Sequence, residues 1–166
     1  MMRVNVNIIE NIKIPIWFNQ IEKFVKQVLK KLKKYRGEIS VVFCDDEYMK
    51  TVNKQYRNID ESTDILSFES QMEAKFFLQK IYEAIYGKYL GDIFISLNML
   101  KINAKYFEVS EIEELQRLLI HGILHLCGYD HEDEHLVNGV EPNCEMLKLQ
   151  EKLLKEFLPK KIIKEK

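Results

Sequence analysis

Three histidines within residues 121–131 have the spacing of a metal site, with three residues between the first two and five before the third. On a helix, residues four positions apart lie on one face, so His121 and His125 can direct two ring nitrogens at one ion. Gly128 can adopt a positive φ and end that helix, after which the chain turns back and brings His131 to the same point. Three nitrogen ligands leave one coordination position open, which is typical of a catalytic zinc site. The spacing therefore predicts one bound ion, most simply Zn²⁺.

A zinc ion held by three neutral imidazoles lowers the pKa of its bound water to about 7, so the predicted chemistry is hydrolysis by a metal-bound water. Another divalent transition metal, such as nickel or copper, also accepts imidazole ligands, and the spacing does not select among them. Zinc proteases with the pattern H-E-x-x-H have a glutamate as general base directly after the first histidine. This chain has Gly122 at that position. Because glycine carries no proton acceptor, the sequence argues against the usual mechanism of peptide hydrolysis.

Residues beside the three histidines have two interpretations each. Asp130 either orients an imidazole by a hydrogen bond or caps the loop that follows Gly128. His135 lies in an acidic stretch and is expected to be solvated. If His135, Cys144 or Asp130 completed the coordination shell, the ion would be structural rather than catalytic.

The first two histidines are on a predicted helix that begins at a capping box formed by Ser110 and Glu113. The second half of this helix is apolar on almost all sides, so we expect it to be buried. Strands are expected at residues 4–8, 38–44, 65–68 and 93–96. Other helices are expected at residues 15–32, 46–56 (capped by Asp45 or Asp46), 97–107 and 146–157. The pattern predicts an α+β fold, a small mixed sheet of about four strands packed with about five helices, with the three-histidine site at the end of a buried helix.

The chain of 166 residues is long enough for one domain, so we expect a single domain over residues 1–166. Residues 70–89 alternate aromatic and charged side chains and are too many for a bare loop, which favours an inserted helix or flap. Aromatic side chains beside lysines in this segment could stack on nucleotide bases, although packing contacts are the commoner role of such residues.

The composition excludes several classes of protein. Apolar residues make up 46% and charged residues 31% of the chain, which is typical of a soluble globular protein. No segment is apolar for long enough to span a bilayer, and no apolar leader is visible at the N-terminus. Three widely spaced cysteines imply no disulfide framework, so a cytoplasmic location is expected. The net charge is −1, and lysine clusters in residues 23–36 and 155–166 either follow a phosphate backbone or are simply solvated.

The histidine segment also resembles a known family. Its sequence, H-G-I-L-H-L-C-G-Y-D-H, is similar to the signature H-G-x-L-H-L-x-G-Y-D-H of the YbeY family of bacterial endoribonucleases. The resemblance extends in order over residues 38–151 and includes N-K-Q-Y-R at 53–57, T-D-I-L-S-F at 63–68, L-G-D-I at 90–93 and Met146 with Gln150 and Glu151. The main departure is residues 69–89, which are longer and more aromatic than the short acidic connection usual in the family.

The resemblance implies a metal-dependent, single-strand-directed endoribonuclease that matures the 3′ end of 16S ribosomal RNA and acts in ribosome quality control. It implies that the three histidines hold the ion and that Arg57 contacts a phosphate of the substrate through its planar guanidinium. The alternative for Arg57 is an ion pair with Asp60 or Asp64. The implied partners are ribosomal RNA in the small ribosomal subunit and a ribosomal protein or a GTPase. The oligomeric state and the general base are left open.

Two other classes of function fit the sequence. One is a metallohydrolase of a different substrate, such as a peptide or a small ester. The other is a non-catalytic ribosome-assembly factor that uses zinc to stabilise its fold. An open fourth coordination position favours an enzyme, whereas a loss of stability on chelation without any activity to lose would favour the assembly factor.

Overall fold

The computed structural model of the chain describes residues 2–9, 12–70, 83, 85 and 87–164. These residues contain one sheet, in the order β1-β2-β4-β3. Its strands are β1 (Met2–Ile8), β2 (Gly37–Cys44), β3 (Ile65–Glu69) and β4 (Tyr89–Ser96). β1, β2 and β4 are parallel, whereas β3 pairs with β4 in the antiparallel direction at one edge. The mixed sheet predicted from the sequence is therefore confirmed.

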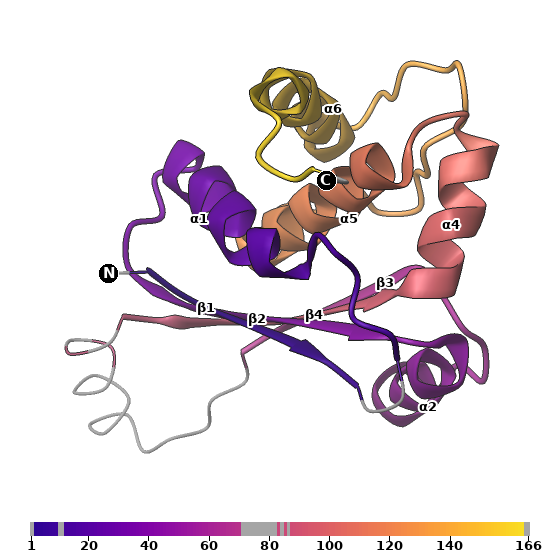
Figure 1. Cartoon of the computed structure of the whole chain (residues 1–166), viewed down its shortest axis with the longest axis horizontal. Helices are drawn as coiled ribbons and strands as arrows, with labels where there is room; N and C mark the ends of the chain where they lie inside the picture. The colour runs from indigo at the N-terminus through magenta and orange to yellow at the C-terminus, as the bar shows by residue number, and fades with distance from the viewer. Residues whose placement is uncertain (1, 10–11, 71–82, 84, 86, 165–166) are drawn as a thin grey trace.

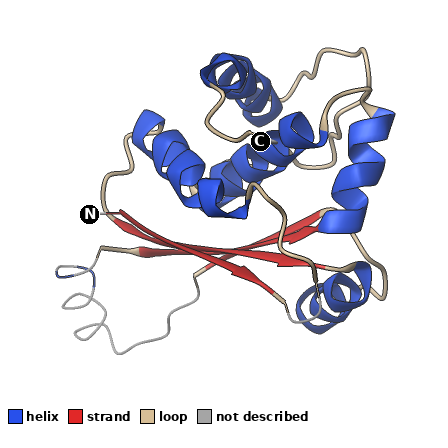
Figure 2. Cartoon of the chain, in the orientation of Figure 1, coloured by secondary structure: helices blue, strands red, loops and turns tan. Residues whose placement is uncertain are grey.

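The helices lie mainly on one side of this sheet (Figures 1 and 2). On that side are α1 (Ile21–Lys31), α4 (Leu97–Tyr106), α5 (Glu111–Leu126) and α6 (Glu145–Phe157). The helix α2 (Asp46–Arg57) lies on the opposite side, at one end of the sheet. The described part of the chain thus has the α+β architecture, with four strands and five α-helices, that the sequence predicts.

Helix α5 is the centre of the packing, as its apolar sequence predicts. Leu119, Ile120, Ile123 and Leu124 have no exposed surface and belong to the main core together with residues of β2, β4 and α1. Burying each such aliphatic side chain contributes about 1.5–3 kcal/mol. The helix begins where the capping box predicts, because the Ser110 hydroxyl accepts a hydrogen bond of 3.1 Å from the backbone N–H of Glu113.

Some boundaries differ from the sequence-based expectation. A 3₁₀ turn at Phe18–Gln20 precedes α1, which begins at Ile21 rather than near Pro15. β4 begins at Tyr89, so Gly91 lies inside the strand. Of the two candidate caps for α2, Asp45 is the one used, since its carboxylate accepts from the backbone N–H of Tyr48.

The predicted inserted helix or flap at 70–89 falls largely on residues 71–82, 84 and 86, which lie outside the described residues. Across the ranges that are described, no helix combines the length and the apolar character needed to cross a membrane.

Candidate metal centre

The structure brings the three predicted ligands together at the C-terminal end of α5. One ring nitrogen of each of His121, His125 and His131 lies within 4.8 Å of the corresponding nitrogens of the other two. The ring centroids are 4.7 Å apart for His121 and His125, 5.0 Å for His121 and His131, and 5.1 Å for His125 and His131. Two ligands separated by one helical turn and a third from the following loop therefore converge on one point.

The third histidine reaches this point because α5 ends in a Schellman motif. The backbone N–H of Tyr129 donates to the carbonyl of Leu124, and that of Gly128 donates to the carbonyl of His125. Gly128 has a φ of +91°, a backbone conformation that residues other than glycine rarely adopt. The reversal of the chain directs the next residues back over the end of the helix, where His131 lies.

A buried glutamine fixes the protonation of His121. The side-chain oxygen of Gln150, on α6, lies 2.7 Å from His121 Nδ1, and the amide nitrogen of Gln150 donates to Glu151 at 3.2 Å. Because the side-chain nitrogen of Gln150 donates to Glu151, the side-chain oxygen of Gln150 is the atom that faces the imidazole. An amide oxygen only accepts hydrogen bonds, so His121 Nδ1 carries the proton. His121 Nε2 then carries the lone pair, and this nitrogen lies 3.1 Å from His125 Nε2. This is the tautomer that a metal ligand needs.

Two further observations are compatible with a metal ion at this point. His131 Nδ1 is buried and has no hydrogen-bond partner among the described residues. A buried polar atom without a hydrogen-bond partner destabilises the fold. A bound cation would provide His131 Nδ1 with a partner in place of a hydrogen bond. Burial, and next the neighbouring His125, lowers the pKa of His121 to about 4, so this ring is a neutral nitrogen donor at neutral pH.

The lowered pKa of His121 predicts how the metal-free protein responds to acid. The unfolded chain binds a proton at this ring near pH 6.5, whereas the folded protein resists until about pH 4. The unfolded state therefore binds more protons in between, so this contribution to stability is complete above about pH 6.5 and is lost as the pH falls toward 4. We expect a loss of about 3 kcal/mol in the free energy of unfolding of chelator-treated protein.

Urea denaturation at a series of pH values measures this effect. Titration of carboxylates also weakens the fold in acid, so the informative quantity is the difference between wild type and His121→Gln. The variant should have a shallower decline between pH 6.5 and pH 4. Parallel declines in the two proteins would contradict the assignment of a buried neutral His121.

Packing explains why a glycine occupies the position of the protease glutamate. A Cβ at Gly122 would lie 2.8–3.0 Å from three side-chain carbons of Ile93 on β4. The glycine therefore lets α5 approach the sheet closely, and its Cα faces the core rather than the metal centre. A glutamate at this position would be directed into Ile93, which supports the argument against protease chemistry made from the sequence.

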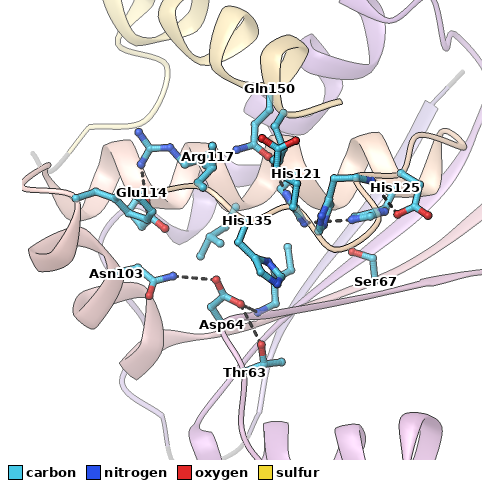
Figure 3. Close-up of a pocket in the computed structure, with 18 of the residues that line it drawn as sticks. Thr63, Asp64, Ser67, Asn103, Glu114, Arg117, His121, His125, His135 and Gln150 are labelled. Carbon is cyan, nitrogen blue, oxygen red and sulfur yellow. Dashed lines mark hydrogen bonds and ion pairs between the residues drawn. The ribbon is translucent and has the colours of Figure 1, made fainter. Parts of the chain in front are cut away.

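The metal centre lies in a cleft of about 570 Å³ (Figure 3). Asp64 and Ser67 come from β3 and the segment before it, and Asn103 comes from α4. Helix α5 contributes Glu114, His121 and His125. Figure 3 shows His135 from the loop after α5 projecting into the same space, toward Asp64. The sequence predicts a solvated His135, and the side chain is indeed exposed, but it lines the cleft rather than facing away from it.

Arg57, the residue predicted to contact a phosphate, lines the same cleft as the histidines. It lies at the end of α2 and is exposed. The two carboxylates considered as its partners are engaged elsewhere: Asp60 lies near Lys50 and Lys54, and Asp64 accepts a hydrogen bond of 2.8 Å from Asn103. Among the described residues, no carboxylate forms an ion pair with Arg57.

Asp130 acts on the backbone of the loop. Its carboxylate accepts a hydrogen bond of 2.8 Å from the backbone N–H of His131, and this bond lowers the pKa of Asp130 below its usual value. The contact matches the capping interpretation of this residue. By holding the backbone of His131, the cap also helps to position a predicted ligand.

One buried network of acidic and polar side chains was not anticipated from the sequence. Glu114 is 1% exposed and pairs with Arg117, which in turn donates to Glu151 at 3.0 Å. Burial raises the pKa of Glu114, and the neighbouring guanidinium of Arg117 opposes this shift. Since Glu151 also accepts from Gln150, a continuous chain of polar contacts links Glu114 to His121, a predicted metal ligand.

Comparison with known proteins agrees with this architecture. The family model described as endoribonuclease YbeY matches residues 5–158 of the chain. The chain belongs to the endoribonuclease YbeY family. It is 45% identical over 138 residues to the endoribonuclease YbeY of Treponema denticola, which covers 83% of this chain and 82% of that protein. It is 42% identical over 149 residues to the endoribonuclease YbeY of Borreliella burgdorferi, which covers 90% of this chain and 92% of that protein.

A solved structure has the same fold. The solution structure of TM1509 from Thermotoga maritima is similar to this chain with a TM-score of 0.58 and 26% sequence identity. The similarity covers 96% of this chain and 91% of that one. The YbeY family resemblance inferred from the histidine segment is therefore confirmed, and the relatives' names describe hydrolases that cut RNA.

Proposed function

We propose that this chain is a zinc-dependent, single-strand-directed endoribonuclease that matures the 3′ end of 16S ribosomal RNA. The observation that carries the proposal is the position of Arg57, an exposed guanidinium without a described carboxylate partner, in the same cleft as three converging histidines. A phosphodiester is the substrate that such a pair of groups matches. Its anionic oxygens suit a planar guanidinium on one side and a divalent cation on the other.

Each side chain has a distinct part in this proposal. His121, His125 and His131 would hold the ion, which would supply Lewis acidity to a phosphoryl oxygen. Arg57 would donate to a non-bridging oxygen and stabilise the negative charge that develops as the phosphorus is attacked. Gln150 keeps His121 in the tautomer with a free Nε2, and Asp130 holds the backbone of His131. Arg117 is neutralised by Glu114 and Glu151, so Arg57 is left as the cation for the substrate.

The biological setting forms part of the same proposal. We place the protein in the cytoplasm, where it would act on the small ribosomal subunit, in maturation and in ribosome quality control. A ribosomal protein or a GTPase would recruit it there. The names of the relatives support an RNA substrate, and the absence of a spanning helix in the described ranges is compatible with this setting.

The test is cleavage of a labelled RNA that spans the 3′ end of a 16S precursor. Purified wild type, His125→Ala, chelator-treated wild type and the chelated protein with zinc added back would be compared. The same RNA annealed to its complement tests the preference for single strands, and a peptide and a small ester test other hydrolase activities.

We expect cutting of the unpaired RNA by wild type and by the zinc-restored protein alone. Equal cutting by His125→Ala would contradict the proposal, because it would show that the activity does not depend on the metal centre. Hydrolysis of the peptide or ester instead of RNA would identify a different metallohydrolase. Zinc-dependent stability without any hydrolysis would identify an assembly factor.

A further inference from the structure

The last turn of α2 displays an exposed aromatic ring next to Arg57. Tyr56 is 63% exposed. Its ring lies 5.0 Å from that of Phe68 on β3, with an angle of 44° between the two planes. The neighbouring Arg57 also contacts Phe68, since its Cζ lies 5.9 Å from the ring centroid. Phe68 therefore supports both side chains.

The ring behind Tyr56 is packed against further aromatic rings. Phe68 contacts Phe94 of β4 at 6.0 Å, and Phe94 stacks on Tyr48 from the first turn of α2 at 6.4 Å. Tyr56, Phe68, Phe94 and Tyr48 thus form a row of aromatic rings, which runs from one end of α2 to the other through two strands of the sheet. An aromatic ring held in this way loses little further freedom when a planar ligand stacks on its exposed face.

The row and the cleft meet at Arg57. β3 is an edge strand, and its successive side chains alternate between the two sides of the sheet. Ser67 lines the cleft on the α5 side, whereas Phe68 packs on the α2 side. Arg57 contacts Phe68 and also lines the cleft, so it lies at the edge that a strand of RNA would cross in passing from one side to the other.

We propose that Tyr56, supported by Phe68, is a stacking platform for one unpaired nucleobase of an RNA substrate, next to the phosphate held by Arg57. The inference rests on the proposed ribonuclease function and adds to it a subsite and a source of strand selectivity. An aromatic side chain stacks on any base through its π-face, which is accessible only when the base is not already stacked in a helix. The subsite would therefore favour single strands without reading their sequence.

The experiment measures binding of a fluorescent, unstructured RNA of about ten nucleotides to chelator-treated protein, in which cleavage is prevented. Wild type is compared with Tyr56→Ala, which removes the ring, and Tyr56→Phe, which retains it. Tyr35→Ala is the matched control, because it removes a tyrosine that is 61% exposed, close to the 63% of Tyr56, and that neither belongs to the row of aromatic rings nor lines the cleft. A parallel series of RNAs carries a single abasic nucleotide at each position in turn.

We expect Tyr56→Ala to weaken binding at least about fivefold, with Tyr56→Phe and Tyr35→Ala close to wild type. At one position, the abasic RNA should bind wild type as weakly as the intact RNA binds Tyr56→Ala, and there the substitution should have no further effect. Cross-linking of a 4-thiouridine RNA to wild type should label Tyr56, a readout that does not depend on any variant folding.

Two outcomes would overturn the inference and are distinguishable from each other. If wild type binds and cuts RNA but Tyr56→Ala binds equally well, the ribonuclease function stands and the subsite does not. If wild type neither binds nor cuts RNA, the proposed function fails and the subsite fails with it.

Discussion

Replacement of Arg57 by alanine is expected to lower kcat/KM for RNA cleavage by about 10²–10³-fold, the usual cost of losing one donor to the charge of a transition state. Arg57 lines the cleft without an ion-pair partner among the described residues, whereas Arg117, the other arginine of the described lining, pairs with Glu114 and Glu151. Arg57→Lys should recover only part of the loss, because an ammonium keeps the charge but not the two parallel N–H groups of a guanidinium. Initial rates over a range of RNA concentrations measure kcat and KM separately.

Lys54→Ala is the matched control for this prediction. It removes one positive charge from the same helical turn, but Lys54 pairs with Asp60 and lines a different surface pocket from the cleft that Arg57 lines. If Lys54→Ala and Arg57→Ala reduced cleavage equally, the effect would be a general attraction of RNA to positive charge. The zinc content of Arg57→Ala should equal that of wild type, and a lower content would mean that the guanidinium acts through the metal centre instead.

The convergence of the three histidines could be predicted from the sequence because their geometry is local. His121 and His125 are one helical turn apart, and Gly128 supplies the positive φ that reverses the chain toward His131. All of these residues fall within one helix end and its capping motif. Helical periodicity and the conformational preference of glycine were therefore sufficient, without knowledge of any distant contact.

The supporting residues could not be predicted in this way because they depend on tertiary packing. Gln150 is 29 residues from His121 in sequence and reaches it only because α6 packs on α5. The resemblance to the YbeY signature included Gln150 and Glu151, and this was the one signal that marked them. For Arg57, the choice between an ion pair and a free guanidinium depended on which partners Asp60 and Asp64 found in the folded chain.

Gly91 shows how a local rule can give the wrong boundary. A glycine commonly ends a strand, so the strand was expected to begin after Gly91, whereas β4 begins at Tyr89. Gly91 has a φ of +140°, and a Cβ there would lie 2.0 Å from the carbonyl oxygen of Phe68 on the neighbouring strand. The glycine therefore marks the close approach of β3 to β4 beside an irregularity in the pairing of β2 with β4.

Replacement of Gln150 by leucine is expected to weaken zinc binding about 10–100-fold, although Gln150 would not touch the ion. Its side-chain oxygen accepts from His121 Nδ1 at 2.7 Å. Gln150 is only 1% exposed, so water cannot readily replace this oxygen as the acceptor. Without this acceptor, His121 loses the interaction that keeps its proton on Nδ1 and its lone pair on Nε2. Competition with a chromophoric chelator measures the zinc affinity directly, independently of any activity.

Matched variants separate this positioning role from a general effect on the core. Gln116→Leu also replaces a 1% exposed glutamine, one whose side-chain oxygen has no described hydrogen-bond partner, and it should leave zinc affinity unchanged. Gln150→Glu retains an acceptor for His121 and should bind zinc within a few-fold of wild type, even if the new carboxylate beside Glu151 lowers stability. Equal losses of zinc affinity in Gln150→Leu and Gln116→Leu would show that the metal centre responds to core packing in general. A loss in Gln150→Leu alone, restored by glutamate, would mean that α6 holds the metal site in its binding form through one hydrogen bond.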